Sequence, residues 1–110
     1  MTKTRTALAA AAIILPSILA GAAVGAASTT VDQAGLAFNM PALTVKRGQS
    51  VVFQNSDRTV HNITVSGPGM TFNGGLQKPG DKVSVLFTKA GAFNVSCGIH
   101  PKMKMTVTAS

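Results

Sequence analysis

One cysteine, two histidines and a methionine in this chain could together bind a metal ion. Two residues separate Cys97 from His100, two more separate His100 from Met103, and His61 precedes the cysteine by 36 positions. A thiolate, two imidazoles and a thioether suit copper that cycles between Cu(I) and Cu(II), because soft sulfur favours the reduced ion and imidazole binds both. In such a site the imidazoles and the thiolate form a trigonal plane, and the methionine is a weak, long axial ligand.

The prediction depends on the combination of these residues rather than on any one of them. A methionine near a strand start usually lies in the core, a buried cysteine behaves as a small hydrophobic residue, and a single histidine is more often structural than a ligand. This chain has only one cysteine and two histidines, and all three fall where one site requires them. A tight turn between Cys97 and His100 would bring both donors to one ion, and Pro101 would stiffen the chain before Met103.

The elements that must position these donors are β-strands of a single domain. After residue 28 no stretch keeps a helical apolar period, whereas short runs rich in Val, Thr and Phe alternate with turn signals. Six or seven short antiparallel strands of this kind predict a β-sandwich. The expected strands are residues 42–46, 50–54, 61–65, 82–87, 92–97 and 103–108, with an edge strand within 31–38.

Strand alternation predicts where the donors lie. Successive side chains in a strand point to opposite faces, so each donor continues a core-facing apolar series. These series are His61, Ile63 and Val65; Phe93, Val95 and Cys97; and Met103, Met105 and Val107. The donors therefore stand at strand ends that can converge at one pole of the sandwich.

Residues 1–27 are predicted to be a Sec-type signal peptide. Lys3 and Arg5 precede an apolar stretch over residues 7–20, and small residues fill positions 21–27, as a signal peptidase requires. An uncleaved membrane anchor is the alternative, because residues 7–27 are long enough to span a bilayer. The weak hydrophobicity of Ala and Gly favours cleavage, which would leave residues 28–110 in the periplasm without membrane insertion.

Composition excludes several other classes of protein. The net charge is +7, but the chain has no Trp, no Tyr and no Lys/Arg run, which disfavours nucleic-acid binding. A single cysteine cannot form an internal disulfide. The absence of Glu and of paired carboxylates argues against general acid-base catalysis. A catalytic Cys97 and His100 pair would leave His61 and Met103 unexplained, so we expect no enzyme.

Two segments, residues 53–62 and 90–103, resemble the cupredoxins of the plastocyanin, amicyanin and pseudoazurin group. The resemblance covers essentially all of residues 28–110, and the spacing of the donors, with Pro101 directly after His100, is most similar to amicyanin. It implies a Greek-key β-sandwich of six to eight short strands. It also implies a monomer that holds one type 1 copper and carries single electrons between redox proteins such as a dehydrogenase, a cytochrome c or an oxidase.

The resemblance also implies roles for individual residues. His61, Cys97, His100 and Met103 would be the copper ligands, Asn55 would brace the ligand loop, and the backbone amide of Asn62 would donate a hydrogen bond to the cysteine sulfur. The ring edge of His100 would reach solvent through an apolar collar. The expected collar residues are Val60, Ile99 and Pro101, with Leu36, Met40 or Pro41 as further candidates.

The sequence departs from the family pattern in two informative ways. Ser96 stands before the cysteine where these proteins commonly have a bulky residue, which puts the usual electron path beside the cysteine in doubt. Met105 has the spacing from His100 that plastocyanin uses for its axial ligand, and it points to the same side of the strand as Met103. We favour Met103 as the ligand because Met105 and Val107 together fit the core of the last strand.

Charge and donor set suggest how the site would be used. Lys102, Lys104 and Arg58 would place positive charge near the collar and favour an acidic docking surface on the partner, unless they are simply solvated loop residues. Copper delivery or sequestration is the alternative function. The complete donor set favours an electron carrier, because a buried thiolate site releases metal slowly.

Overall fold

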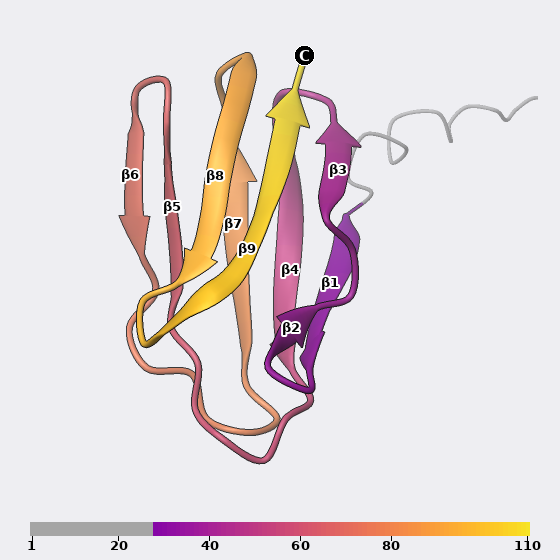
Figure 1. Cartoon of the computed structure of the whole chain (residues 1–110). Coiled ribbons are helices and arrows are strands. Elements are labelled where there is room, and N and C mark those ends of the chain that lie inside the picture. The colour runs from indigo at the N-terminus through magenta and orange to yellow at the C-terminus, as the bar shows by residue number, and fades with distance from the viewer. Residues whose placement is uncertain (1–27) are drawn as a thin grey trace, which may run out of the picture.

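The computed structural model describes residues 28–110, which form two β-sheets packed face to face (Figure 1). The predicted signal peptide, residues 1–27, lies outside the described residues. One sheet contains β1 (Thr29–Ala34), β2 (Ala37–Phe38), β4 (Gln49–Asn55) and β7 (Lys82–Phe87), in the order β2-β1-β4-β7. The other contains β3 (Ala42–Val45), β5 (Ile63–Gly67), β6 (Met70–Asn73), β8 (Gly91–Cys97) and β9 (His100–Ala109), in the order β3-β9-β8-β5-β6.

The chain crosses repeatedly from one sheet to the other, as in a Greek-key sandwich. It crosses between β2 and β3, β3 and β4, β4 and β5, β6 and β7, and β7 and β8. Two of the strand pairs, β1 with β4 and β3 with β9, are parallel, so the expectation of antiparallel strands throughout is wrong at these pairs. Parallel neighbours require a crossover connection, and strands from the other sheet lie between the members of each pair in sequence.

The all-β sandwich predicted from the sequence is confirmed, with no helix in residues 28–110. Accordingly, none of the described segments is a helix long and apolar enough to cross a membrane. The described residues form nine strands rather than six to eight. One added strand is β6, which pairs with β5 in a stretch between residues 65 and 82 where no strand was predicted.

The other added strand comes from the segment expected to be one edge strand, residues 31–38. It is a hairpin in which β1 pairs with β2, and β1 lies inside the sheet between β2 and β4. The turn residues Gly35 and Leu36 have φ angles of 63° and 59°. Two successive residues with positive φ allow a tight hairpin turn. The pattern was missed because leucine rarely adopts this conformation.

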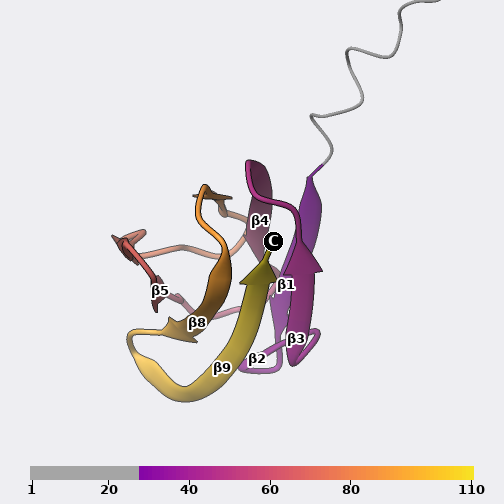
Figure 2. The same cartoon turned by 90° about the horizontal axis from the view of Figure 1, so that it is seen from above.

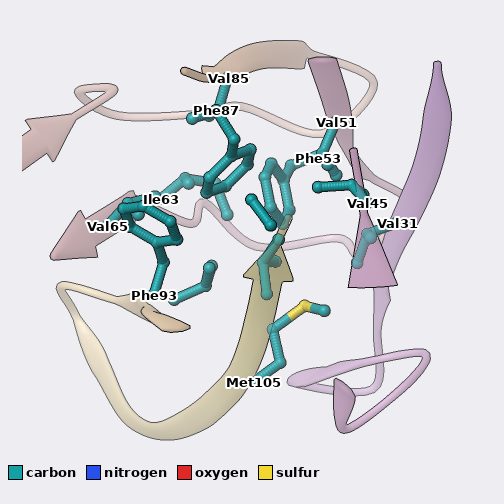
Figure 3. Close-up of a cluster of buried hydrophobic side chains, with 13 residues drawn as sticks. Val31, Val45, Val51, Phe53, Ile63, Val65, Val85, Phe87, Phe93 and Met105 are labelled. Atoms are coloured by element: carbon teal, nitrogen blue, oxygen red, sulfur yellow. The ribbon is translucent and has the colours of Figure 1, made fainter. Parts of the chain in front are cut away.

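The core fills the space between the sheets (Figure 3). Phe53 of β4, Phe87 of β7 and Phe93 of β8 are buried there, and the rings of Phe87 and Phe93 meet edge to face with centroids 5.2 Å apart. Val95 and Val107 lie in the same cluster, as strand alternation predicts. The core thereby holds together the strands whose ends carry the candidate donors.

Those ends lie at one pole of the sandwich. The connections from β4 to β5, from β6 to β7 and from β8 to β9 lie at the lower end of Figure 1, together with the tip of the β1–β2 hairpin. Figure 2 shows that β9 curves from β8 round to β3, and it pairs with both of them. This single strand therefore joins the cysteine-bearing end of the sheet to the edge beside the hairpin.

Phe87→Ala should lower the free energy of unfolding of the metal-free protein by about 3–5 kcal/mol, because it leaves a cavity among buried aromatic rings. Leu86→Ala is the matched control, since its side chain is 52% exposed on the opposite face of the same strand, and a change within about 0.5 kcal/mol is expected. Urea denaturation of both variants would measure the two changes in the free energy of unfolding. Equal losses would contradict the observed packing of β7.

Candidate metal centre

Three candidate donors from separate parts of the chain meet at the pole. His61 lies between β4 and β5, Cys97 is the last residue of β8 and His100 is the first of β9. The Nδ1 atoms of the two histidines are 3.1 Å apart, and the Cys97 sulfur lies 3.7 Å from Nδ1 of His61 and 3.5 Å from Nδ1 of His100. His61 and Cys97 are buried, and His100 is partly exposed.

This triangle of atoms has the size that a metal site requires. The point equidistant from the two nitrogens and the sulfur lies about 2.0 Å from each, close to the lengths of metal bonds to imidazole and thiolate. Two imidazoles and a thiolate in one trigonal arrangement are the donor set of a type 1 copper site. The residues present therefore fit a copper ion.

Local strand geometry holds Cys97 and His100 together. They face each other across the β8–β9 turn, where the pairing register shifts at Ser96 and Cys97. The next residue, Gly98, donates its N–H to the carbonyl of Asn62 at 2.8 Å. A Cβ at Gly98 would collide with the side-chain oxygen of Asn62, so any larger residue here would have to displace that side chain.

The cysteine sulfur also accepts a hydrogen bond from the backbone N–H of Asn62 at 3.2 Å. This is the contact that the family resemblance implied, and the structure confirms it. A donor of this kind lowers the electron density on the sulfur and so tunes a bound metal. It also ties the residue after His61 directly to the end of β8.

His61 does not belong to a strand, and the expected strand over residues 61–65 begins only at Ile63. Its backbone forms an isolated bridge with Gln77, in which the His61 N–H donates to the Gln77 carbonyl at 2.9 Å and the Gln77 N–H donates back at 2.7 Å. Ile63 already pairs with Cys97. His61 therefore lies beyond the paired part of β5 and β8, with its Nδ1 3.7 Å from the cysteine sulfur.

Asn55 braces the loop that leads to His61, in agreement with its expected role. Its side-chain amide donates to the carbonyls of Thr59 and Gln77, each at 2.9 Å, and its side-chain oxygen accepts from the N–H of Asp57 at 2.9 Å. The side chain is 1% exposed, so these hydrogen bonds satisfy a buried polar group. They fix the course of residues 55–61.

Asp57 was not among the residues predicted from the sequence, yet its carboxylate oxygen Oδ2 lies 2.7 Å from Nε2 of His61. Burial raises the pKa of Asp57, but hydrogen bonds from the Leu36 amide, the His61 ring and the Gly35 amide lower it to below its usual value. An ionised carboxylate can only accept, so Nε2 carries the ring proton and Nδ1 presents a lone pair. Only the spacing of four residues between Asp57 and His61 could have signalled this contact.

The two candidate axial methionines have different surroundings. Met105 belongs to the apolar core cluster, where Figure 3 shows its side chain among the buried residues. Met103 is also buried, but it lies outside that cluster and lines a pocket together with His100 and Pro101. The two side chains share one side of β9, as alternation predicted, yet of the two only Met103 lines the pocket beside His100.

An apolar surface surrounds the exposed part of His100. Leu36, Ile99 and Pro101 line the pocket beside the ring, and Leu36 and Ile99 are exposed. These three are among the expected collar residues. Met40 and Pro41 instead line a neighbouring depression with Lys102 and Lys104, and Val60 lines neither of these two depressions.

Basic side chains at this pole form no ion pairs within residues 28–110. Among residues 28–110 no lysine or arginine forms an ion pair with a carboxylate, and the one contact of ion-pair length is the hydrogen bond between Asp57 and the His61 ring. Lys102 and Lys104 are exposed on β9 next to the apolar surface, and Arg58 is exposed in the loop before His61.

Comparison with known proteins identifies the family. The model for copper binding proteins of the plastocyanin/azurin family matches residues 25–110. The chain belongs to this family. It is 33% identical over 82 residues to amicyanin-alpha of Methylorubrum extorquens, which covers 72% of the chain and 69% of the relative. It is 32% identical over 91 residues to amicyanin of Paracoccus denitrificans, with 80% of the chain and 70% of the relative covered.

Solved structures agree with this assignment. A reduced amicyanin variant superposes with a TM-score of 0.70 and 29% sequence identity over 76% of this chain and 82% of its own. A purple cupredoxin from Nitrosopumilus maritimus, at 22% identity, shares the fold with a TM-score of 0.67 over 74% of this chain and 99% of its own. The chain is thus an amicyanin-like type 1 copper protein. The predicted cupredoxin family, copper cofactor and absence of enzymatic activity are confirmed by this membership.

Proposed function

We propose that this protein is an exported one-electron carrier whose copper is held by His61, Cys97, His100 and Met103. The convergence of two imidazole nitrogens and a thiolate sulfur within 3.1–3.7 Å of one another carries this proposal. Bound copper would supply the one-electron change between its cuprous and cupric states. Because one donor geometry serves both states, little rearrangement would accompany each transfer.

The protein residues keep that geometry rigid. The His61 ring is hydrogen-bonded to Asp57, and the His61 backbone is bridged to Gln77. The cysteine sulfur at the end of β8 accepts a hydrogen bond from the Asn62 amide. Met103 is proposed as the axial ligand because it is buried beside His100 and is not part of the core cluster. A single coordination geometry then follows from the packing of the strands that supply the donors.

Electrons would enter and leave at His100. This ring is the partly exposed one of the two histidines, and the apolar surface beside it would allow close contact with a partner. Lys102 and Lys104 lie next to this surface and form no ion pair with a described carboxylate, which favours an acidic docking surface on the redox partner. Ser96 is not aromatic, which further favours His100 over a path beside the cysteine.

Export and the nature of the partners complete the proposal. Residues 1–27 would act as a cleaved signal peptide, and residues 28–110 would form the cupredoxin domain in the periplasm. The partners would be redox proteins such as a dehydrogenase, a cytochrome c or an oxidase, and a monomer suits brief docking to each. Charge would set how fast they meet rather than how tightly they bind.

Addition of Cu(II) to the protein should produce an intense blue thiolate-to-copper band that bleaches with ascorbate and returns with a mild oxidant. Cys97→Ser should abolish the band because the thiolate is lost. Ser96→Ala is the control and should retain the band, since Ser96 offers no ligand. A wild-type complex that is colourless or exchanges copper rapidly would contradict the carrier and favour copper delivery.

Met103→Leu should keep a coloured site but raise its reduction potential, because a thioether donor is lost next to the thiolate. Met105→Leu should leave the potential unchanged and cost less than about 1.5 kcal/mol of stability, as a volume-conserving change in the core. Voltammetry and urea denaturation of both variants would measure these effects. The reverse pattern would make Met105 the axial ligand.

Lys102→Gln combined with Lys104→Gln should slow oxidation by the anion hexacyanoferrate(III) by up to about tenfold at low ionic strength, because charge near His100 attracts the oxidant. The control combines Lys46→Gln with Lys89→Gln, which removes equal charge from exposed positions. These two residues follow β3 and β7, at the pole opposite the site (Figure 1). Stopped-flow rates that fall equally in both double variants would show that only net charge matters.

A further inference from the structure

The Asp57 carboxylate contacts two parts of the molecule that lie far apart in sequence. Its Oδ2 atom accepts from Nε2 of His61 at 2.7 Å and from the backbone N–H of Leu36 at 2.9 Å. Its Oδ1 atom accepts from the N–H of Gly35 at 2.6 Å. One carboxylate thus links a candidate metal ligand to the turn between β1 and β2.

That turn needs an external partner. Gly35 and Leu36 both have positive φ, a conformation that is unfavourable for leucine because of its Cβ. Their two successive N–H groups both point to the carboxylate. Hydrogen bonds to an ionised acceptor are stronger than those between neutral groups. Asp57 therefore stabilises a turn whose conformation is unfavourable for Leu36.

Asp57 is itself held in place. Its backbone N–H donates to the side-chain oxygen of Asn55, whose amide is anchored to the carbonyls of Thr59 and Gln77. The side chain is 14% exposed, so water competes only weakly for the carboxylate. The buried loop brace therefore holds the backbone from which the carboxylate projects.

The turn in question reaches the surface around the other histidine. Leu36 is 52% exposed and lines the pocket beside His100 together with Ile99 and Pro101. A movement of the Gly35 and Leu36 turn would therefore change the apolar surface next to the exposed ligand. Asp57 therefore contacts the buried His61 ring and also holds Leu36, which is part of the apolar surface beside His100.

We propose that Asp57 is a positioning residue that orients the His61 ring and also holds the turn between β1 and β2. It keeps the proton of His61 on Nε2, so that Nδ1 faces the metal position, and it holds Leu36 in the apolar surface beside His100. The inference rests on the proposed function, because it assumes that His61 is a ligand and that partners dock at His100. It makes the inner ligand and the docking surface depend on one carboxylate.

The test compares Asp57→Ala with wild type in two measurements. In the metal-free protein, hydrogen exchange at the Gly35 and Leu36 amides should become at least about tenfold faster, because both lose a charged acceptor. Cu(I) affinity, measured by competition with a chelator, should fall by about 10–100-fold, as is typical when a partner that orients a ligand is removed. The reduction potential should rise, since the His61 ring becomes a weaker donor.

Two further variants make the result specific. Asp81→Ala removes another carboxylate that accepts a backbone N–H, that of Lys78 at 2.9 Å, but touches neither His61 nor the turn, so both readouts should stay at wild-type values. Asp57→Asn keeps one acceptor oxygen and should give smaller changes than Asp57→Ala. It also provides a folded variant if the alanine protein does not fold.

The inference is overturned if Asp57→Ala and Asp57→Asn match Asp81→Ala in both measurements. It is also overturned if copper affinity falls while exchange at Gly35 and Leu36 is unchanged, because the two tasks are then separate. Failure of the proposed function would look different. The wild-type protein would then lack the blue band, whereas failure of this inference leaves that band intact.

Discussion

The pairing of Ile63 with Cys97 is the contact on which the metal centre depends. It brings together two segments separated by more than thirty residues, and it places His61 just beyond the end of β8. The Asn62 N–H can then reach the cysteine sulfur, and the Gly98 N–H can reach the Asn62 carbonyl. A shift of this register by one residue would turn the apolar side chains of β5 away from the core, so the same burial that stabilises the sandwich also sets the site.

A second constraint comes from the polar groups beneath the site. Gln77 is 1% exposed and uses its side-chain amide to donate to the carbonyls of Phe53 and Asp81, at 2.7 and 3.1 Å. Its side-chain oxygen accepts from Gln33 at 2.8 Å. Buried amides are costly unless they are hydrogen-bonded, and once bonded they permit few alternative arrangements. This network joins β1, β4 and the loop before β7 without a disulfide.

The pole that carries the candidate donors has a buried part and a part at the surface. His61 and Cys97 are buried and held by backbone hydrogen bonds, which suits donors that must keep one geometry. His100 begins β9, where the chain emerges beside apolar and basic side chains. The turn between β8 and β9 thus joins a rigid interior to a surface that a partner could contact. A sandwich fold allows this because its loops gather at the strand ends.

The sequence alone determined the all-β sandwich, the donor set and the faces of the strands that carry it. Alternation of apolar residues and the spacing of one cysteine and two histidines are local patterns, and they are visible without tertiary structure. Asn55 and the Asn62 amide were accessible only through the family resemblance, because their partners lie elsewhere in the chain.

Tertiary structure decided the rest. It showed that His61 bridges Gln77 instead of starting a strand, that residues 31–38 form a hairpin, and that Asp57 links that hairpin to His61. Each of these contacts joins segments that are distant in sequence, or stabilises a backbone conformation that its own residues disfavour. Local propensity carries no information about such contacts, since their energy exists only once the sheets have packed.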